Sequence, residues 1–389
     1  MRKTFDALPL QYWILLIGTF ITRAGNFVIP MLFVYLTQRR GMTLSMAGSV
    51  VSTFGVGSLV GTLLGGVCAD AMGRRKTMLY SLISSAVAVL LLGLTDTYWQ
   101  TLVVIFFLGL CSDAYKPACQ AYVADIIPPR LRMKAFTWYY WVINLGFSVA
   151  AIMGGFFATR NLVLLFVLDA VTTLMLTLLI WHYVDESHMP AVVKAHEDHF
   201  VAPFLDRRFL PFIVLHFFVI LIFYQHITAL AEDMRFKGFS PQQFGFVIAS
   251  NGILVVLLQP FIVKKIQHQS KAKLLAIASL LTGVGFGLTA FAETIPYYIS
   301  TIIIWTLGEI IFSPVNASLV AELSPVSLRG RYQGAFGLTW SLSVIFAPMI
   351  GAVVIEHFGL NVFWLACFFV GTTVAVLQRT IMARILPRR

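Results

Sequence analysis

The chain has 389 residues, of which 59% are apolar and only 12% are charged, and its formal net charge is +11. A soluble domain carries about 25% charged residues, so too little polar surface remains here to coat a water-soluble body. The positive charge does not indicate nucleic acid, because the basic residues lie in short stretches between apolar runs and not on one soluble domain. The composition predicts a membrane protein that crosses the bilayer many times.

Twelve apolar stretches are long enough to cross the bilayer, since a span needs roughly 20 residues. The first is expected to be a retained helix and not a signal peptide, because no small-residue cleavage site precedes it. We therefore predict an all-α membrane protein with twelve transmembrane helices. The predicted spans are residues 10–37, 44–68, 77–95, 99–121, 136–158, 162–183, 209–231, 242–263, 273–292, 296–318, 335–355 and 360–383.

The loops differ strongly in basic residues. With the N-terminus placed in the cytoplasm, the cytoplasmic segments hold 21 Lys and Arg and the outer loops hold 5. This bias predicts that both termini face the cytoplasm. Short loops favour a bacterial inner (cytoplasmic) membrane.

A polar stretch between the sixth and seventh spans divides the chain. We expect an N-terminal six-helix bundle at 1–184, a cytoplasmic linker at 185–208 and a C-terminal six-helix bundle at 209–389. A constant offset of 197 residues aligns the halves: Asp125 falls on Glu322, and Pro117 on Pro314. Such a repeat predicts two pseudo-symmetric bundles with a substrate site near the bilayer midplane.

A loop motif follows the second span and reads GGVCADAMGRRK. It resembles the GxxxDxxGRRK signature of the major facilitator superfamily. The resemblance implies the major facilitator fold and a latch that stabilises the outward-open state. The residues that it implies are Gly66, Asp70, Gly73, Arg74 and Arg75, with Asp125 as the acidic partner. The other interpretation is that these basic residues only set topology. In the second half the motif is degraded, with Gln267 in place of the Asp and Lys271 in place of the first Arg.

Further motifs narrow the resemblance. Lys116-Pro117, the run Tyr139–Gly146 and Gly308-Glu309 resemble proton-coupled oligopeptide transporters and a related branch of proton-driven multidrug and dipeptide exporters. The acids that the importers carry on the first helix are replaced by Thr19 and Thr22. The resemblance implies a proton-coupled secondary transporter of small organic molecules that works by alternating access. An efflux antiporter of drug-like or dipeptide-like substrates is favoured, and a proton/peptide symporter is the alternative.

Ionisable residues inside predicted spans each cost about 2.5–3.5 kcal/mol on insertion scales, and four of them are candidates for a common site. They are Arg23, Asp113, Lys116 and Glu309. The repeat offset puts Asp113 and Glu309 at nearly equal depth in opposite halves. We expect the four to form a cluster in a central cavity, where either carboxylate could carry the coupling proton. The alternative is a static ion network that fixes helices.

Other polar residues are weaker candidates for binding substrate or protons, with helix packing as the alternative: Asn26, Tyr140, Asn144 and His226. Asp169 and His216 are expected to be structural. Glu232, Asp233, Arg235 and Lys237 are expected in a solvated outer loop.

Several classes of function are disfavoured. The sequence lacks a helical HExxH, a GxxxxGK[ST] and a catalytic Ser/His/Asp set, so we do not expect an enzyme. A polytopic membrane enzyme or a channel is kept as the alternative of another class. The four cysteines show no disulfide framework and no metal-ligand spacing. The expected partners are a small-molecule substrate, protons and the lipid bilayer, without nucleic acid, cofactor or metal, and the chain is expected to be a monomer.

Overall fold

The computed structural model describes residues 8–158, 162–187, 201–266, 269–325 and 328–385. Twelve of its helical stretches are long and apolar enough to cross a membrane, and the described residues contain no strand. The predicted all-α fold with twelve spans is therefore confirmed. The chain forms two compact units, Met1–Met42 with Ser49–Val193 and Thr43–Gly48 with Lys194–Arg389. The boundary near Val193 falls within the predicted linker.

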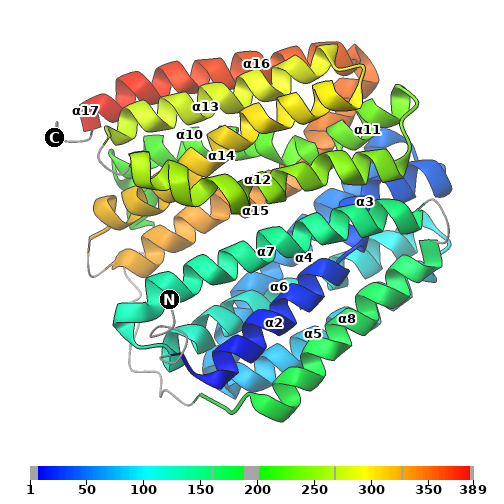
Figure 1. Cartoon of the computed structure of the whole chain (residues 1–389), viewed down its shortest axis with the longest axis vertical. Coiled ribbons are helices and arrows are strands. Elements are labelled where there is room, and N and C mark those ends of the chain that lie inside the picture. The colour runs from blue at the N-terminus through cyan, green and yellow to red at the C-terminus, as the bar shows by residue number, and fades with distance from the viewer. Residues whose placement is uncertain (1–7, 159–161, 188–200, 267–268, 326–327, 386–389) are drawn as a thin grey trace. The chain divides into compact units, whose positions relative to one another are not determined.

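The first unit is built from helices that cross it nearly end to end. Within it α2 lies between α7 and α8, and α5 packs against α6 and α8 (Figure 1). Apolar side chains from these helices form its core, with Tyr12, Tyr122 and Met78 almost fully enclosed. The elements are α2 (Leu10–Gly25), α3 (Val28–Val34), the π-helix η1 (Tyr35–Arg39), α4 (Leu44–Met72), α5 (Arg74–Gly93), α6 (Tyr98–Ile126), α7 (Pro129–Ala158) and α8 (Leu162–Tyr183).

The second unit repeats this plan. In Figure 1, α13 runs beside α14 and α16. The elements are α9 (Ala202–Leu205), α10 (Phe209–Phe223), the 3-10 helix η3 (Tyr224–His226), α11 (Ala229–Phe236), α12 (Pro241–Ile266), α13 (Lys271–Leu288), the 3-10 helix η4 (Thr289–Phe291), α14 (Ile295–Leu323), α15 (Arg329–Phe358), α16 (Leu360–Leu377), the π-helix η6 (Gln378–Met382) and α17 (Ala383–Ile385).

Several helices run past their predicted ends. α4, α6 and α14 end at Met72, Ile126 and Leu323, each more than one turn beyond the predicted ends at 68, 121 and 318. Hydropathy marks the apolar part of a span, whereas backbone hydrogen bonds continue through the polar residues that follow. The helical ends therefore carry the charged motifs of both units on ordered backbone.

The first and seventh spans are both broken near their middle. The first span is interrupted at Asn26 and Phe27, between α2 and α3. The offset of 197 maps this break onto residues 223–224, where α10 gives way to η3. Broken helices inside a membrane are tolerated where the backbone is buried in protein or lines a cavity. The breaks therefore mark comparable depths in the two units.

The expected solvated loop at Glu232–Lys237 is wrong. These residues continue the seventh span as α11, and the side chains of Glu232 and Asp233 are buried, Asp233 completely. Asp233 accepts hydrogen bonds from the Tyr298 hydroxyl, from Trp364 Nε1 at 3.2 Å and from Lys237 Nζ at 3.1 Å. Lys237 is a neighbour in sequence, but Tyr298 and Trp364 come from helices far along the chain, so the local charge pattern could not indicate this burial.

Candidate functional site

A buried carboxylate lies in the middle of α6. Asp113 is 7% exposed and accepts a hydrogen bond from the Ser58 hydroxyl on α4. Lys116, one turn along α6, places its Nζ 2.8 Å from both carboxylate oxygens. The Lys116 side chain remains 44% exposed. Asp113 is thus fixed by one hydroxyl and one ammonium group.

The close packing of α4 and α6 brings Ser58 to Asp113. Three glycines spaced one turn apart on α4 meet the backbone of α6: Gly57, Gly61 and Gly65. A Cβ at Gly61 would overlap the carbonyl group of Leu110. Small residues let helix backbones approach closely in a membrane, so this stripe sets the distance at which the short Ser58 side chain reaches the carboxylate.

Arg23 lies near the end of α2, where Gly146 on α7 lets the two helices approach. A Cβ added at Gly146 would come 2.5 Å from the Cβ of Arg23. The guanidinium is within electrostatic range of Tyr139 and Cys119. Among the residues that the structure describes, Arg23 forms no ion pair. It is a cation inside a span without an acidic side chain in contact.

The asparagine next to Arg23 and the one on the neighbouring helix α7 differ in their hydrogen bonds. The Oδ1 atom of Asn26 is buried and accepts no hydrogen bond from the described residues. The Asn144 amide donates to the backbone carbonyl of Tyr140 at 2.9 Å. Asn144 therefore uses its donor within α7, while Asn26 keeps an unused acceptor at the break of the first span.

Asp169 on α8 lies against the same break. Its side chain is 8% exposed, and Oδ2 accepts a hydrogen bond of 3.3 Å from the backbone N–H of Val28, the first residue of α3. Thr22 donates to the carbonyl of Thr172, one turn further along α8, at 3.5 Å. The break in the first span is thus held to α8 on both of its sides.

The second unit has its own carboxylate, the half-buried Glu309 on α14. The Asn251 amide, from α12, donates to Glu309 Oε2 at 2.7 Å and to the Thr306 hydroxyl at 3.0 Å. Within the described part of the chain, no Lys or Arg pairs with Glu309. The carboxylates of the two units therefore have different partners, since Asp113 pairs with a lysine and Glu309 accepts from a neutral amide.

Two buried histidines of the second unit, His216 and His226, lie among aromatic rings. His226 in η3 bonds through Nδ1 to the carbonyl of Phe223 at 2.6 Å and stacks on Trp305 with centroids 5.9 Å apart. His216 bonds through Nδ1 to the Thr339 hydroxyl at 2.8 Å, and its buried Nε2 has no described partner. His226 borders the broken backbone, whereas His216 fixes α10 to α15.

Three residues of the predicted cluster, Arg23, Asp113 and Lys116, belong to the first unit. Within the first unit, Asp113 contacts Lys116, and Arg23 is near Tyr139, Cys119 and Asp169 instead. Glu309 belongs to the second unit. The expectation that Asp113 and Glu309 face each other across a cavity stays a prediction.

The predicted latch residues lie at the end of α4 and the start of α5. Arg74 pairs with Asp70 one turn earlier, and its Nε lies 3.6 Å from Asp125 Oδ2 on α6. Arg75 instead donates to the carbonyl of Trp181 at 2.6 Å and lies over the Trp181 ring. Arg74 thus joins α5 to α4 and α6, and Arg75 joins it to α8.

Glu186 is a member of this group that the motif does not contain. It follows α8 and accepts hydrogen bonds from the backbone N–H groups of Arg75 and Lys76 at 3.0 and 3.4 Å. The next residue, Ser187, donates to Asp125 at 3.0 Å. An acid one hundred residues away in sequence therefore caps α5, and only its position just after the sixth span could have indicated it.

The two glycines of the motif have different surroundings. Gly73 has φ +101°, and a Cβ there would come 2.5 Å from the Glu186 carboxyl carbon. This position needs glycine both for its backbone conformation and for the close carboxylate. A Cβ at Gly66 would meet no atom within 4 Å, so Gly65 and not Gly66 makes the close contact with α6.

The second unit repeats the ion pair of the latch. Lys271 at the start of α13 pairs with Glu322 on α14 and donates to Ser318 at 2.8 Å. These two residues stand 197 positions after Arg74 and Asp125. Gln267, which replaces the motif Asp, lies outside the described residues.

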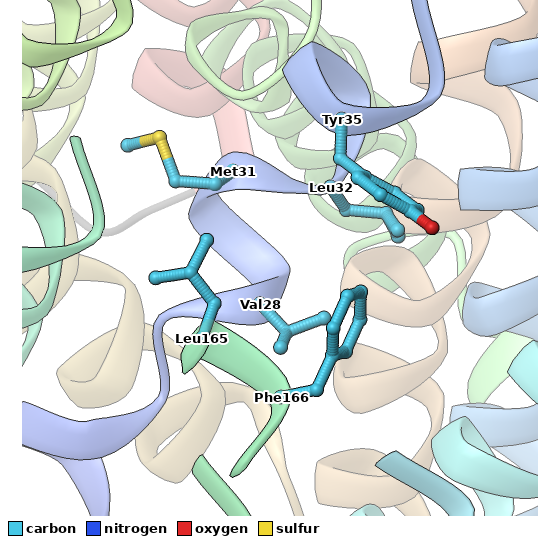
Figure 2. Close-up of a pocket in the computed structure, with 6 residues that line it drawn as sticks. All are labelled: Val28, Met31, Leu32, Tyr35, Leu165 and Phe166. Atoms are coloured by element: carbon cyan, nitrogen blue, oxygen red, sulfur yellow. The ribbon is translucent and has the colours of Figure 1, made fainter. Parts of the chain in front are cut away.

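A small apolar recess opens between α3, η1 and α8. Figure 2 shows Val28, Met31, Leu32 and Tyr35 of the first span facing Leu165 and Phe166 of α8. The unfilled space is about 200 Å³, including its open mouth. None of the six side chains that line the recess is charged.

These features define a multi-pass membrane transporter with buried polar groups inside two repeated units. A family model described as Major Facilitator Superfamily matches residues 15–348 and 213–389. The chain belongs to this superfamily, whose members are transporters and not enzymes.

The chain is similar to a multidrug resistance protein and to a cation/proton antiporter. Multidrug resistance protein 2 of Bacillus subtilis (strain 168) is 27% identical over 383 residues, which cover 92% of this chain and 91% of the relative. A Na(+), Li(+), K(+)/H(+) antiporter of Planococcus maritimus is 24% identical over 372 residues, covering 86% and 87%.

Among solved structures, a POT family transporter in complex with a thioalcohol conjugated peptide has a TM-score of 0.85. The match covers 99% of this chain and 100% of that chain, at 15% identity. At this identity the likeness shows the shared fold alone.

Proposed function

We propose that this protein is a proton-coupled secondary transporter that exports small organic molecules by alternating access. The observation that carries the proposal is Glu309, a carboxylate inside a membrane span whose described partner is the neutral amide of Asn251. An ionised carboxylate without a cation is costly at this depth. Such a group binds and releases a proton as its surroundings change.

The first unit supplies the complementary charges. Asp113 is neutralised by Lys116, so the proposal gives this pair a structural and gating role and gives Glu309 the coupling proton. Arg23 has no acidic partner in contact and provides positive charge for an anionic or electron-rich part of the substrate, with Asn26 and Asn144 as neighbouring polar groups. His226 and Tyr140 are the aromatic candidates for substrate contact.

The relatives support the proposed direction of transport. The likeness to Multidrug resistance protein 2 covers nearly the whole chain and supports export. We place the protein in a bacterial inner membrane as a monomer, with both termini in the cytoplasm and no resident cofactor. This orientation puts the Arg74 and Lys271 pairs on the cytoplasmic side.

The test is transport by purified protein in proteoliposomes with an imposed pH gradient. A lipophilic cation such as ethidium and an alanyl dipeptide serve as the two probes. An exporter drives ethidium against its gradient when protons flow in the opposite direction. Dipeptide uptake together with protons would establish the symporter instead, and exchange of Na⁺ or K⁺ for protons without either probe would overturn an organic substrate.

Matched variants test the coupling residue. Glu309→Gln is expected to lose gradient-driven accumulation while keeping exchange of labelled for unlabelled probe. Glu293→Gln, which changes an exposed carboxylate in the same unit, serves as the control. Accumulation by Glu309→Gln equal to that of the control would remove Glu309 from coupling.

A further inference from the structure

Asp169 is a buried acid that the proposed mechanism does not use. It lies inside the α8 span, is 8% exposed, and its one described hydrogen-bond donor is the backbone N–H of Val28. A carboxylate this deep is normally matched by several donors or by a contacting cation. Among the described residues Asp169 has neither, so its ionised form is only weakly stabilised and the carboxylate can take up a proton.

The charged surroundings of Asp169 are simple. Four α-helices pack against α8, namely α2, α3, α5 and α7. The π-helix η1 also contacts it, since the Tyr35 ring meets Phe166 and the Tyr35 hydroxyl accepts a hydrogen bond from Arg40. α3 carries no titratable side chain, and the Arg75 charge of α5 lies against the far end of α8 beside Trp181. α7 brings Tyr139, which lies near Arg23. Among the described residues, Arg23 on α2 is the charged group close enough to act on Asp169.

The second unit shows that the break itself needs no acid. There Gln225 ties the interrupted backbone to α15 by donating to the carbonyl of Ala347 at 2.9 Å. The residue 197 positions after Asp169 is Ala366. A neutral side chain thus holds one break, whereas a carboxylate holds the other.

A small apolar recess lies beside this contact, between α3 and the turn of α8 that precedes Asp169 (Figure 2). On the α2 side, Gly25 packs directly against Thr172, so that part is held tightly. A weakened contact at Val28 would therefore loosen the start of α3 while α2 stays in place.

We propose that Asp169 is a second proton-binding residue, whose ionised form fastens the α3 half of the first span to α8 and whose protonated form loosens it. The proton adds to one carboxylate oxygen, and the charge-assisted hydrogen bond from Val28 becomes a weaker bond to a neutral carboxyl group. The inference rests on the proposed function, because it adds a gate on the first span to a proton-coupled transporter.

Hydrogen–deuterium exchange of the protein in lipid nanodiscs tests this without transport. Exchange in a peptide covering residues 28–34 is followed from pH 5 to pH 9 and corrected for the intrinsic exchange rate. Protection is expected to fall about tenfold towards low pH, a size in line with the loss of a capping carboxylate. A wild-type peptide whose corrected protection does not change with pH overturns the inference.

Three variants sharpen the result. Asp169→Asn, whose amide oxygen still accepts from Val28, must remove the pH dependence, and a response equal to wild type overturns the inference. If that variant does not fold, Asp169→Glu must shift the midpoint of the response, and an unmoved midpoint also overturns it. Glu309→Gln must keep the wild-type response in this peptide. The exchange experiment therefore tests the Asp169 contact independently of the proton-coupled transport assigned to Glu309.

Discussion

Lys271 and Glu322 form an ion pair in the second unit at the positions that Arg74 and Asp125 occupy in the first. The motif around Lys271 has lost its recognisable sequence, yet the pairing of its helices is retained. The repeat therefore preserves an electrostatic contact between the third and fourth spans of each half, although only one half keeps the full signature.

Reversing the Lys271–Glu322 pair gives the first prediction. Lys271→Glu places two acids together and is expected to slow transport about two- to fivefold, since a partly exposed pair is worth roughly 0.2–1 kcal/mol. The double variant Lys271→Glu with Glu322→Lys should regain most of the rate in proteoliposomes. A double variant as slow as the single one would show that the charge pairing is not what matters.

The glycine stripe on α4 gives a prediction for stability. Gly61→Val is expected to destabilise the protein by about 1–3 kcal/mol, because its side chain would overlap the backbone of Leu110. Gly66→Ala is the matched control, since a Cβ there meets no neighbouring atom. In thermal unfolding in detergent, Gly61→Val should have a lower Tm than the wild type, and Gly66→Ala should not. Equal Tm values for the two variants would contradict the close approach of α4 and α6.

Asp233 is expected to be among the most sensitive residues of the second unit. Asp233→Ala leaves the Tyr298 hydroxyl, the Trp364 N–H and the Lys237 ammonium group without their acceptor. Breaking a buried ion pair in this way costs about 3–5 kcal/mol. Thermal unfolding measures the loss, with the exposed Glu293→Ala as the control. A substitution at an exposed site changes the Tm by only about 1–2 °C. A change as small as that in Asp233→Ala would mean that Asp233 is not buried.

Glu186 should stabilise the latch through the start of α5. Glu186→Ala removes the acceptor for two backbone N–H groups and is expected to cost about 0.5–2 kcal/mol, the range of helix caps. Glu186→Gln, which keeps an oxygen acceptor, should lose less. Asp185→Ala changes the exposed neighbouring acid and is the control; an equal loss in that variant would assign the effect to net charge and not to capping.

The sequence allowed the membrane spans, the two-unit organisation and the latch motif to be predicted, because each depends on local composition or on a fixed spacing. Twenty apolar residues form a helix in lipid wherever they lie. Lys116 and Asp113 could be placed on one face because they are three residues apart on a helix. These predictions needed no knowledge of tertiary contacts.

The remaining features depend on partners that are distant in the chain. Asp233 resembles a loop acid until Tyr298 and Trp364, 65 and 131 residues away, surround it. Glu186 caps a helix that begins more than one hundred residues earlier. The break at Asn26 is different, because Gly25 precedes it and Pro30, four residues on, has no N–H to donate to the Asn26 carbonyl. The contact between Asp169 and Val28 again joins residues that are far apart in the chain. Periodicity cannot supply such contacts.

Proton movement driven by a substrate gradient tests the central claim most directly. Proteoliposomes that contain a trapped pH-sensitive dye are given a gradient of the transported probe and no imposed pH difference. The account predicts an opposing flow of protons with the wild-type chain and with Glu293→Gln, and none with Glu309→Gln. Probe movement without any change in internal pH, or proton flow that persists in Glu309→Gln, would contradict it.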